Sequence, residues 1–310
     1  MGRRKSSLTA IGVAAVACAV GALLTGFAPA DEDRAGAAEV VGEIQKISPD
    51  AVAGSVATNT SADAVTAASV NRDGINVTVP RDAEDGIRLA GGDEPVTVIG
   101  LPFGQDASDA VDSQLSGVVV YDNNNGSSTV PVVRDFGVQI STLIENASAP
   151  QRYDYSLELP VGEQLRLNLD GSVSAVDTAG IGSIYVPAPW AKDANGAHVP
   201  THYEVSGNVL TQVVDFTAVS AFPVVADPTI VKTTYTYSRA DVERMWNTLQ
   251  WAGLICNVID LPYMASLLCG GSTRLNDAVS SAHYQKKRLK ATFNNCGFTY
   301  CNYYEYVVVS

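Results

Sequence analysis

Histidine and the usual catalytic signatures are scarce in this chain of 310 residues. It has three histidines, and neither the G-x-S-x-G pattern of a nucleophile elbow nor the H-E-x-x-H pattern of a zinc helix occurs. His202 has Asp193, Glu204 and Asp215 near it in the sequence, but a histidine base also needs a nucleophile within hydrogen-bond reach. We therefore interpret the histidines as surface or packed residues, and the sequence predicts no catalytic residue.

Cysteine is absent from residues 19–255, so no disulfide is expected in the larger part of the chain. The four cysteines beyond that stretch form an even set, which indicates disulfides in an exported protein. Three pairings are possible, and we favour Cys256 with Cys269 and Cys296 with Cys301. A zinc site built from all four is the alternative, but C-x-x-C pairs are missing. We expect neither a metal nor a cofactor.

The start of the chain has the pattern of a secretory signal peptide. Residues 3–5 are basic, Leu8–Phe27 is apolar, and residues 28–30 read Ala-Pro-Ala, a small-x-small cleavage pattern. A retained membrane anchor is the alternative, since the apolar stretch is about long enough to span a bilayer. Cys18 lies inside the apolar run, which argues against lipid attachment. We expect cleavage near Asp31 and a secreted, extracellular protein.

Positive charge is scarce as well. The chain has 20 Lys and Arg against 33 Asp and Glu, a net charge of −13. Residues 31–237 hold 10 against 28, a net charge of −18, whereas residues 238–310 hold 7 against 5, a net charge of +2. The acidic part would repel phosphates, so no nucleic-acid partner is expected. Acidity by itself also serves solubility outside the cell.

Aromatic residues are absent from residues 31–70, which are small, polar and rich in alanine. We expect a poorly ordered, low-complexity leader there, with a helical turn or two over residues 39–47. From residue 71 to residue 228, short alternating segments recur between turn signals, and no helical pattern interrupts them. Roughly nine to eleven such strands predict an all-β domain, an antiparallel β-sandwich or a barrel-like fold.

The densest local signals lie in Tyr185–Pro228. Gly207-Asn208 is a two-residue turn between the alternating segments Thr201–Val205 and Val209–Phe216, which predicts a β-hairpin. The segments PWAKDANG, VPTHYEV, GNVLTQVVD and PVVADP occur here in this order. Together they resemble a stretch found in secreted actinobacterial proteins of unknown function. This resemblance implies no assigned activity and no catalytic residues.

Residues 238–310 predict a second, smaller unit after a connector at 229–237. Ser238–Asp241 has the form of a capping box at a helix start, and Pro262 stands near the start of a second helix. Leu275 to Leu289 suggests a third helix, and Thr292–Val309 suggests a hairpin. A module of this size has a marginal core, so the predicted disulfides would staple it.

A basic run beside an aromatic run is the candidate binding surface. One interpretation is contact with an anionic cell-envelope polymer, a membrane surface or another protein; the other is a solvated helix face next to a packed hairpin. The run 122–126 has oxygen ligands such as calcium takes, but a hairpin turn accounts for it fully. The residues of the candidate surface are Lys286, Lys287, Arg288, Lys290, Tyr303, Tyr304 and Tyr306.

These observations favour a mainly β fold followed by a small, disulfide-stapled, mostly helical α+β C-terminal module. The missing catalytic pattern favours a secreted, non-enzymatic interaction or envelope-associated protein, in which the acidic β domain presents the module. One alternative is an exported toxin or bacteriocin-like effector that acts through the module. Another is a hydrolase whose site the sequence does not reveal.

Overall fold

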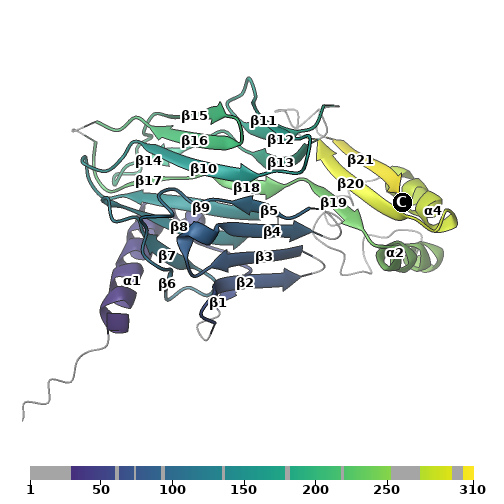
Figure 1. Ribbon diagram of the computed structural model, residues 1–310, viewed down its shortest axis with the longest axis horizontal. Coiled ribbons are helices and arrows are strands. Elements are labelled where there is room, and N and C mark those ends of the chain that lie inside the picture. Colours follow the sequence, from purple (N-terminus) through teal and green to yellow (C-terminus); the bar gives the residue numbers. More distant parts are fainter. Residues whose placement is uncertain are drawn as a thin grey trace, which may run out of the picture.

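The chain folds into two large antiparallel sheets, a small third sheet and flanking helices (Figure 1). The computed structural model describes residues 29–59, 63–72, 75–91, 95–134, 137–178, 182–217, 220–252, 273–294 and 303–310. The prediction of a mainly β fold with antiparallel sheets is confirmed. Among the described residues, no helix combines the length and apolar character needed to cross a bilayer.

The first sheet has eight strands in the order β1-β2-β3-β4-β5-β10-β16-β15. The hairpin predicted around Gly207-Asn208 is confirmed, and it forms one end of this sheet. Its strands are β1 (Thr58–Asn59), β2 (Thr66–Arg72), β3 (Ile75–Pro80), β4 (Ile87–Gly91), β5 (Thr97–Ile99), β10 (Arg152–Glu158), β15 (Thr201–Ser206) and β16 (Val209–Val214). A short 3-10 helix, η2 (Ala83–Asp85), joins β3 to β4.

The second sheet has ten strands, eight of them in the order β11-β12-β13-β18-β9-β8-β7-β6, with β17 between β14 and β9. The hairpin predicted around residues 122–126 is confirmed as the pair β7–β8. The strands are β6 (Val111–Asp112), β7 (Val119–Asp122), β8 (Ser127–Arg134), β9 (Gly137–Ile144), β11 (Gln164–Leu167), β12 (Val173–Val176), β13 (Gly182–Val186), β14 (Ala191–Lys192), β17 (Val224–Ala226) and β18 (Thr229–Lys232).

The main core lies between these two sheets, as in a β-sandwich. One cluster of buried apolar side chains includes Leu89 and Tyr155 from the first sheet and Ile140 and Ile184 from the second. Strand β10 alternates buried and exposed residues along its whole length, because one face meets the core and the other meets solvent. The alternation that predicts strands from sequence therefore has its physical cause in this packing.

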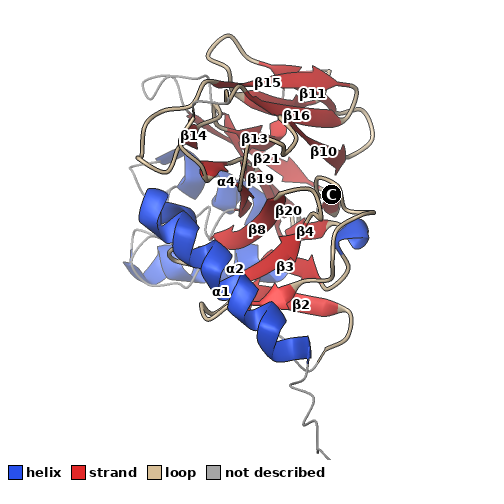
Figure 2. Cartoon of the chain, turned by 90° about the vertical axis from the view of Figure 1, so that its left-hand side faces the viewer, coloured by secondary structure: helices blue, strands red, loops and turns tan. Residues whose placement is uncertain are grey.

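Strands β8 and β9 differ, because nearly every residue in them is buried. Their outer face is covered by helix α1 (Pro29–Ile47), which lies across the second sheet (Figures 1 and 2). Ala37, Val41 and Ile44 pack there with sheet residues such as Val130 and Leu143 in a second cluster. The sandwich thus has a third layer on one side.

The prediction of a poorly ordered leader over residues 31–70 needs correction. This stretch contains most of α1, the 3-10 helix η1 (Pro49–Ala51), strand β1 and most of strand β2. Ala37, Val41 and Ile44 recur at helical spacing, so aliphatic side chains without an aromatic residue form a stripe that covers a sheet. Helix α1 also begins before the predicted cleavage site near Asp31, and cleavage there would leave nearly all of it in the mature chain.

The C-terminal unit combines helices α2 (Arg239–Ala252) and α4 (Thr273–Tyr284) with a three-stranded sheet in the order β19-β20-β21. The capping box is confirmed, because the Ser238 hydroxyl donates to Asp241 Oδ2 at 2.7 Å and accepts from the Asp241 backbone N–H at 3.2 Å. The strands are β19 (Thr234–Tyr237), β20 (Arg288–Asn294) and β21 (Tyr303–Val309). They surround a separate small core that includes Tyr237, Met245 and Leu289.

Two boundary predictions change in this region. The expected connector at 229–237 is two strands, β18 in the second sheet and β19 in the small sheet. The third helix ends at Tyr284 rather than continuing to Leu289, which is buried on strand β20. Lys286 has a positive φ of 53°, which breaks the helix before the strand begins. The second helix near Pro262 and all five cysteines lie outside the described residues.

Candidate functional site: an acidic groove beside the first helix

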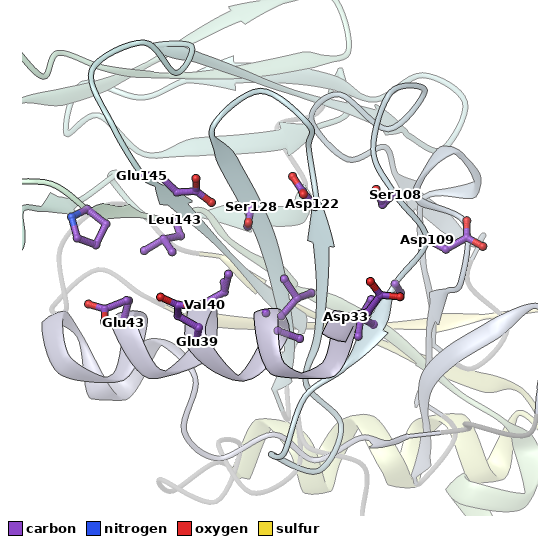
Figure 3. Close-up of a pocket in the computed structure, with 16 residues that line it drawn as sticks. Asp33, Glu39, Val40, Glu43, Ser108, Asp109, Asp122, Ser128, Leu143 and Glu145 are labelled. Carbon is purple, nitrogen blue, oxygen red and sulfur yellow. The ribbon is translucent and has the colours of Figure 1, made fainter. Parts of the chain in front are cut away.

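A groove with a volume of about 1040 Å³ runs between helix α1 and the neighbouring end of the second sheet (Figure 3). Six of its lining side chains are carboxylates, and they come from both walls (Figure 3). Its hydroxyl groups are those of Ser108 and Ser128. The six carboxylates are Asp33, Glu39, Glu43, Asp109, Asp122 and Glu145.

Local structure places these acids on opposite walls. Glu39 and Glu43 are four residues apart, so they share one face of α1. Asp122 ends strand β7, and its Oδ1 accepts the backbone N–H of Asn124 at 2.8 Å, which fixes the carboxylate at the turn. Glu145 directly follows strand β9, and its backbone N–H donates to the carbonyl of Gly126 at 2.9 Å.

The electrostatics of the groove are those of crowded negative charge. Partial burial raises the pKa of the Glu145 carboxyl, and the like charges of Asp122 and Glu39 raise it further. A cation beside Glu145 would reverse this effect, because an opposite charge favours the ionised carboxylate. Lys46 pairs with Glu43 at 2.5 Å, but its side chain is 71% exposed and is not part of the lining.

The chemistry that the groove can perform follows from what lines it. None of the sixteen described lining residues is a lysine, arginine, histidine or cysteine. Within the described ranges, no group of three or more His, Cys, Asp or Glu side chains is arranged to hold a metal ion. The described lining of the groove therefore presents carboxylates, two hydroxyl groups and apolar side chains, which together make an open, negatively charged surface.

Sequence reasoning missed this groove, although two of its signals were visible. Glu39 and Glu43 belong to the segment expected to form a helical turn, and Asp122 belongs to the turn weighed as a calcium loop. In the structure the side-chain oxygens of that loop serve the turn: Asn125 Oδ1 accepts the Ser127 hydroxyl at 2.7 Å. What the sequence could not show is that α1 and this turn face each other.

Two of the three acids that lie near His202 in the sequence also lie near it in the structure, on an open surface. His202 Nε2 lies 3.6 Å from Glu204 Oε1, and its Nδ1 lies 3.5 Å from Asp215 Oδ2. Glu204 also accepts from the Arg152 guanidinium at 2.6 Å, and this bond holds the pKa of Glu204 below its usual range. All these side chains are about half exposed, and Asp193 instead caps its own turn.

The basic run is only partly available for binding. Lys286 and Lys287 are exposed, whereas the Arg288 guanidinium donates to the Ser310 carbonyl at 2.8 Å and 2.5 Å. Lys290 lies near Glu163 of the β domain, where its charge partly offsets the rise that burial causes in the pKa of Glu163.

The predicted aromatic run likewise faces inward where it is described. The Tyr306 side chain is half-buried and packs on the small core of the C-terminal unit. The backbones of Tyr303 and Tyr304 belong to strand β21, and their side chains lie outside the described set. Among the described residues of the candidate surface, Lys286 and Lys287 are exposed, and Arg288, Lys290 and Tyr306 are partly buried.

A second feature that sequence reasoning missed is a buried polar cluster around Asp227. This residue is 1% exposed, and its Oδ1 accepts from the Trp190 backbone N–H at 2.9 Å and from Gln212 Nε2 at 3.3 Å. Gln212 Nε2 also lies 3.2 Å from the hydroxyl of Thr201. Burial raises the pKa of Asp227 to about 7, although these hydrogen bonds partly offset the rise.

This cluster gives a structural reason for the four short segments singled out in the sequence. Trp190, Thr201, Gln212 and Asp227 come from PWAKDANG, VPTHYEV, GNVLTQVVD and PVVADP respectively. The bond between Gln212 and Asp227 joins β16 of the first sheet to the end of β17 in the second. One residue of each segment therefore takes part in a hydrogen-bonded cluster inside the sandwich.

No protein-family model matches the chain, and no curated protein matches it. The resemblance to secreted actinobacterial proteins accordingly stays a prediction.

Proposed function

We propose that this chain is a secreted, non-enzymatic interaction protein that binds a cationic peptide segment through the acidic groove. The observation that carries the proposal is the groove's composition: carboxylates on both walls, and no basic side chain among its described lining residues. Clustered charge of one sign in a concave surface concentrates the field and attracts ligands of the opposite sign.

The shape of the groove favours an extended ligand over a compact one. Its volume of about 1040 Å³ is at the upper end of the usual range for small-molecule sites. The carboxylates are spread along both walls, from Asp33 and Glu39 on α1 to Asp122 and Glu145 on the sheet (Figure 3). A peptide with several lysine or arginine side chains can place a charge near each of them.

A titration with hexalysine, followed by calorimetry, tests this proposal. We expect binding at 20 mM NaCl that weakens strongly at 300 mM, because exposed charges are screened beyond about 10 Å at 0.1 M salt. The double variant Asp122→Asn with Glu145→Gln should weaken binding about tenfold or more. Glu158→Gln, at an exposed position on β10 of the other sheet, is the control and should bind like the unaltered chain. Equal binding by all three proteins would contradict the proposal.

Secretion and disulfide stapling belong to the same proposal. The N-terminal charge pattern and the Ala-Pro-Ala site support export, and the four clustered cysteines support stapling of the C-terminal unit. N-terminal sequencing of protein recovered from the medium should begin near Asp31. Recovery of a chain that starts at Met1 would contradict the secretory assignment.

A hydrolase is the second candidate, and one observation favours it. Glu145 and Asp122 are two carboxylates in one groove, and the raised pKa of Glu145 is the property required of a general acid. The test is release of reducing sugar ends from cell-wall polysaccharide. Activity that Glu145→Gln abolishes would support the hydrolase, whereas no activity together with hexalysine binding would support the binding protein.

A further inference from the structure

Helix α1 is held to the sheet by a narrow stripe and is weak in itself. Its buried side chains are small or branched aliphatics, such as Ala37, Val41 and Ile44. Gly36 and Gly42 lie inside the helix, and a Cβ placed on either would meet no atom within 4 Å. Packing therefore does not require glycine at these positions, yet each glycine lowers helix stability relative to alanine.

Charge opposes the docking of this helix. Glu39 on α1 faces the wall that carries Asp122 and Glu145, whereas Glu43 is paired with Lys46 (Figure 3). Both Asp122 and Glu39 act on the Glu145 carboxyl, so the two walls are close enough to repel each other. Like charges across a short gap destabilise the closed arrangement unless a cation or salt reduces the repulsion.

The C-terminal end of α1 is fastened more firmly than its body. The Arg134 guanidinium on β8 donates to the carbonyl of Asp50 in η1. The Ser141 hydroxyl on β9 lies 3.5 Å from the carbonyl of Ala51. Side chains of the second sheet thus hold the backbone directly after the helix, which gives the helix a fixed end about which it can move.

We propose that α1 is a strap, hinged at η1, whose closure over the second sheet is controlled by positive charge in the groove. Cations between the walls close the strap, and their removal favours an open form that bares the apolar outer face of the sheet. That face includes Val118, Val120, Val130 and Val132, which α1 covers. The proposal deepens the proposed function, because a cationic ligand would close the strap, but the opening itself needs no ligand.

Hydrogen exchange of the purified, signal-free chain, measured by mass spectrometry, tests the strap. At 20 mM NaCl, amides of residues 33–47 should exchange much faster than those of β9, and 300 mM NaCl should slow them about threefold or more by screening. The double variant Glu39→Gln with Glu145→Gln should slow them to a similar extent at low salt and remove most of the salt effect. Glu158→Gln should leave the exchange rates of residues 33–47 unchanged at both salt concentrations.

A neutral variant checks that the measurement reports on α1. Gly42→Ala should slow exchange of the helix about fivefold at either salt concentration, since it strengthens the helix without changing its charge. The strap is refuted if α1 exchanges as slowly as β9, or if salt and the charge variants leave its exchange unchanged while Gly42→Ala slows it. If the unaltered chain does not bind hexalysine but the hydrogen exchange of α1 still slows with salt, the proposed ligand is refuted and the strap is supported.

Discussion

The buried carboxyl of Asp227 predicts a stability that falls as pH rises. Its pKa is about 7 in the folded chain and 3.8 in the absence of burial. Between these values the folded state binds more protons than the unfolded state, so the free energy of unfolding decreases with pH. The contribution of Asp227 to the free energy of unfolding is fully present below about pH 4, declines between pH 4 and pH 7, and is lost above about pH 7.

The size of the effect follows from the same two values. A difference of about three pKa units corresponds to roughly 4 kcal/mol at about 1.4 kcal/mol per unit. Asp227→Asn keeps an oxygen that accepts from the Trp190 N–H and from Gln212 Nε2. The asparagine cannot ionise. The free energy of unfolding of this variant should therefore equal that of the unaltered chain near pH 4 and exceed it by about 2–4 kcal/mol at pH 8.

Urea unfolding at pH 4, 5, 6, 7 and 8, followed by circular dichroism, measures this difference for both proteins. Subtracting the two curves removes the titration of all other groups. Asp106→Asn makes the same change at an exposed site, and its difference should stay within about 0.5 kcal/mol at every pH. A difference between Asp227→Asn and the unaltered chain that does not change with pH would refute the reasoning.

Three further predictions concern the sandwich and the C-terminal unit. Gly137→Ala should lower the free energy of unfolding by about 1–3 kcal/mol, because the new methyl group would collide with the Ile230 carbonyl on β18; thermal unfolding measures this, and an unchanged melting temperature would refute the close approach. Reduction should destabilise residues 238–310 by about 2–4 kcal/mol per disulfide and leave the sandwich nearly unaffected, as hydrogen exchange with and without reductant would show. Equal loss in both parts would contradict the predicted stapling. Finally, Lys286→Gln with Lys287→Gln should abolish any salt-sensitive binding of the chain to anionic vesicles, measured by co-sedimentation; binding that persists would exclude these two exposed lysines as its cause.

Local chemistry allowed the sequence to predict the β-hairpins. Gly207 has a positive φ of 58° in the turn between β15 and β16, a conformation that glycine adopts without strain. The alternation along β10 is equally local, because each residue's face is set by its neighbours in the strand. These signals sufficed for a mainly β fold.

The errors arose where distant packing decides the structure. The local sequence around Ala37, Val41 and Ile44 does not reveal the sheet that they cover, so the segment was expected to be poorly ordered. Leu289 continues a helical spacing from Leu275 but is buried on a strand, because the chain turns at Lys286. The groove and the Asp227 cluster were missed for the same reason, since each joins segments far apart in the chain.

Under the proposed secretion, the covering of the second sheet by α1 would impose an order of events on the folding of the chain. Helix α1 precedes every strand on which it packs, so in export from the N-terminus it would emerge before strands β7, β8 and β9. Alone, a helix of this length with two interior glycines is marginal in water. In a secreted chain, a segment that crosses the membrane early would thus be among the last to acquire its final structure, and until then the apolar outer face of the sheet would be accessible to chaperones, to neighbouring copies and to proteases.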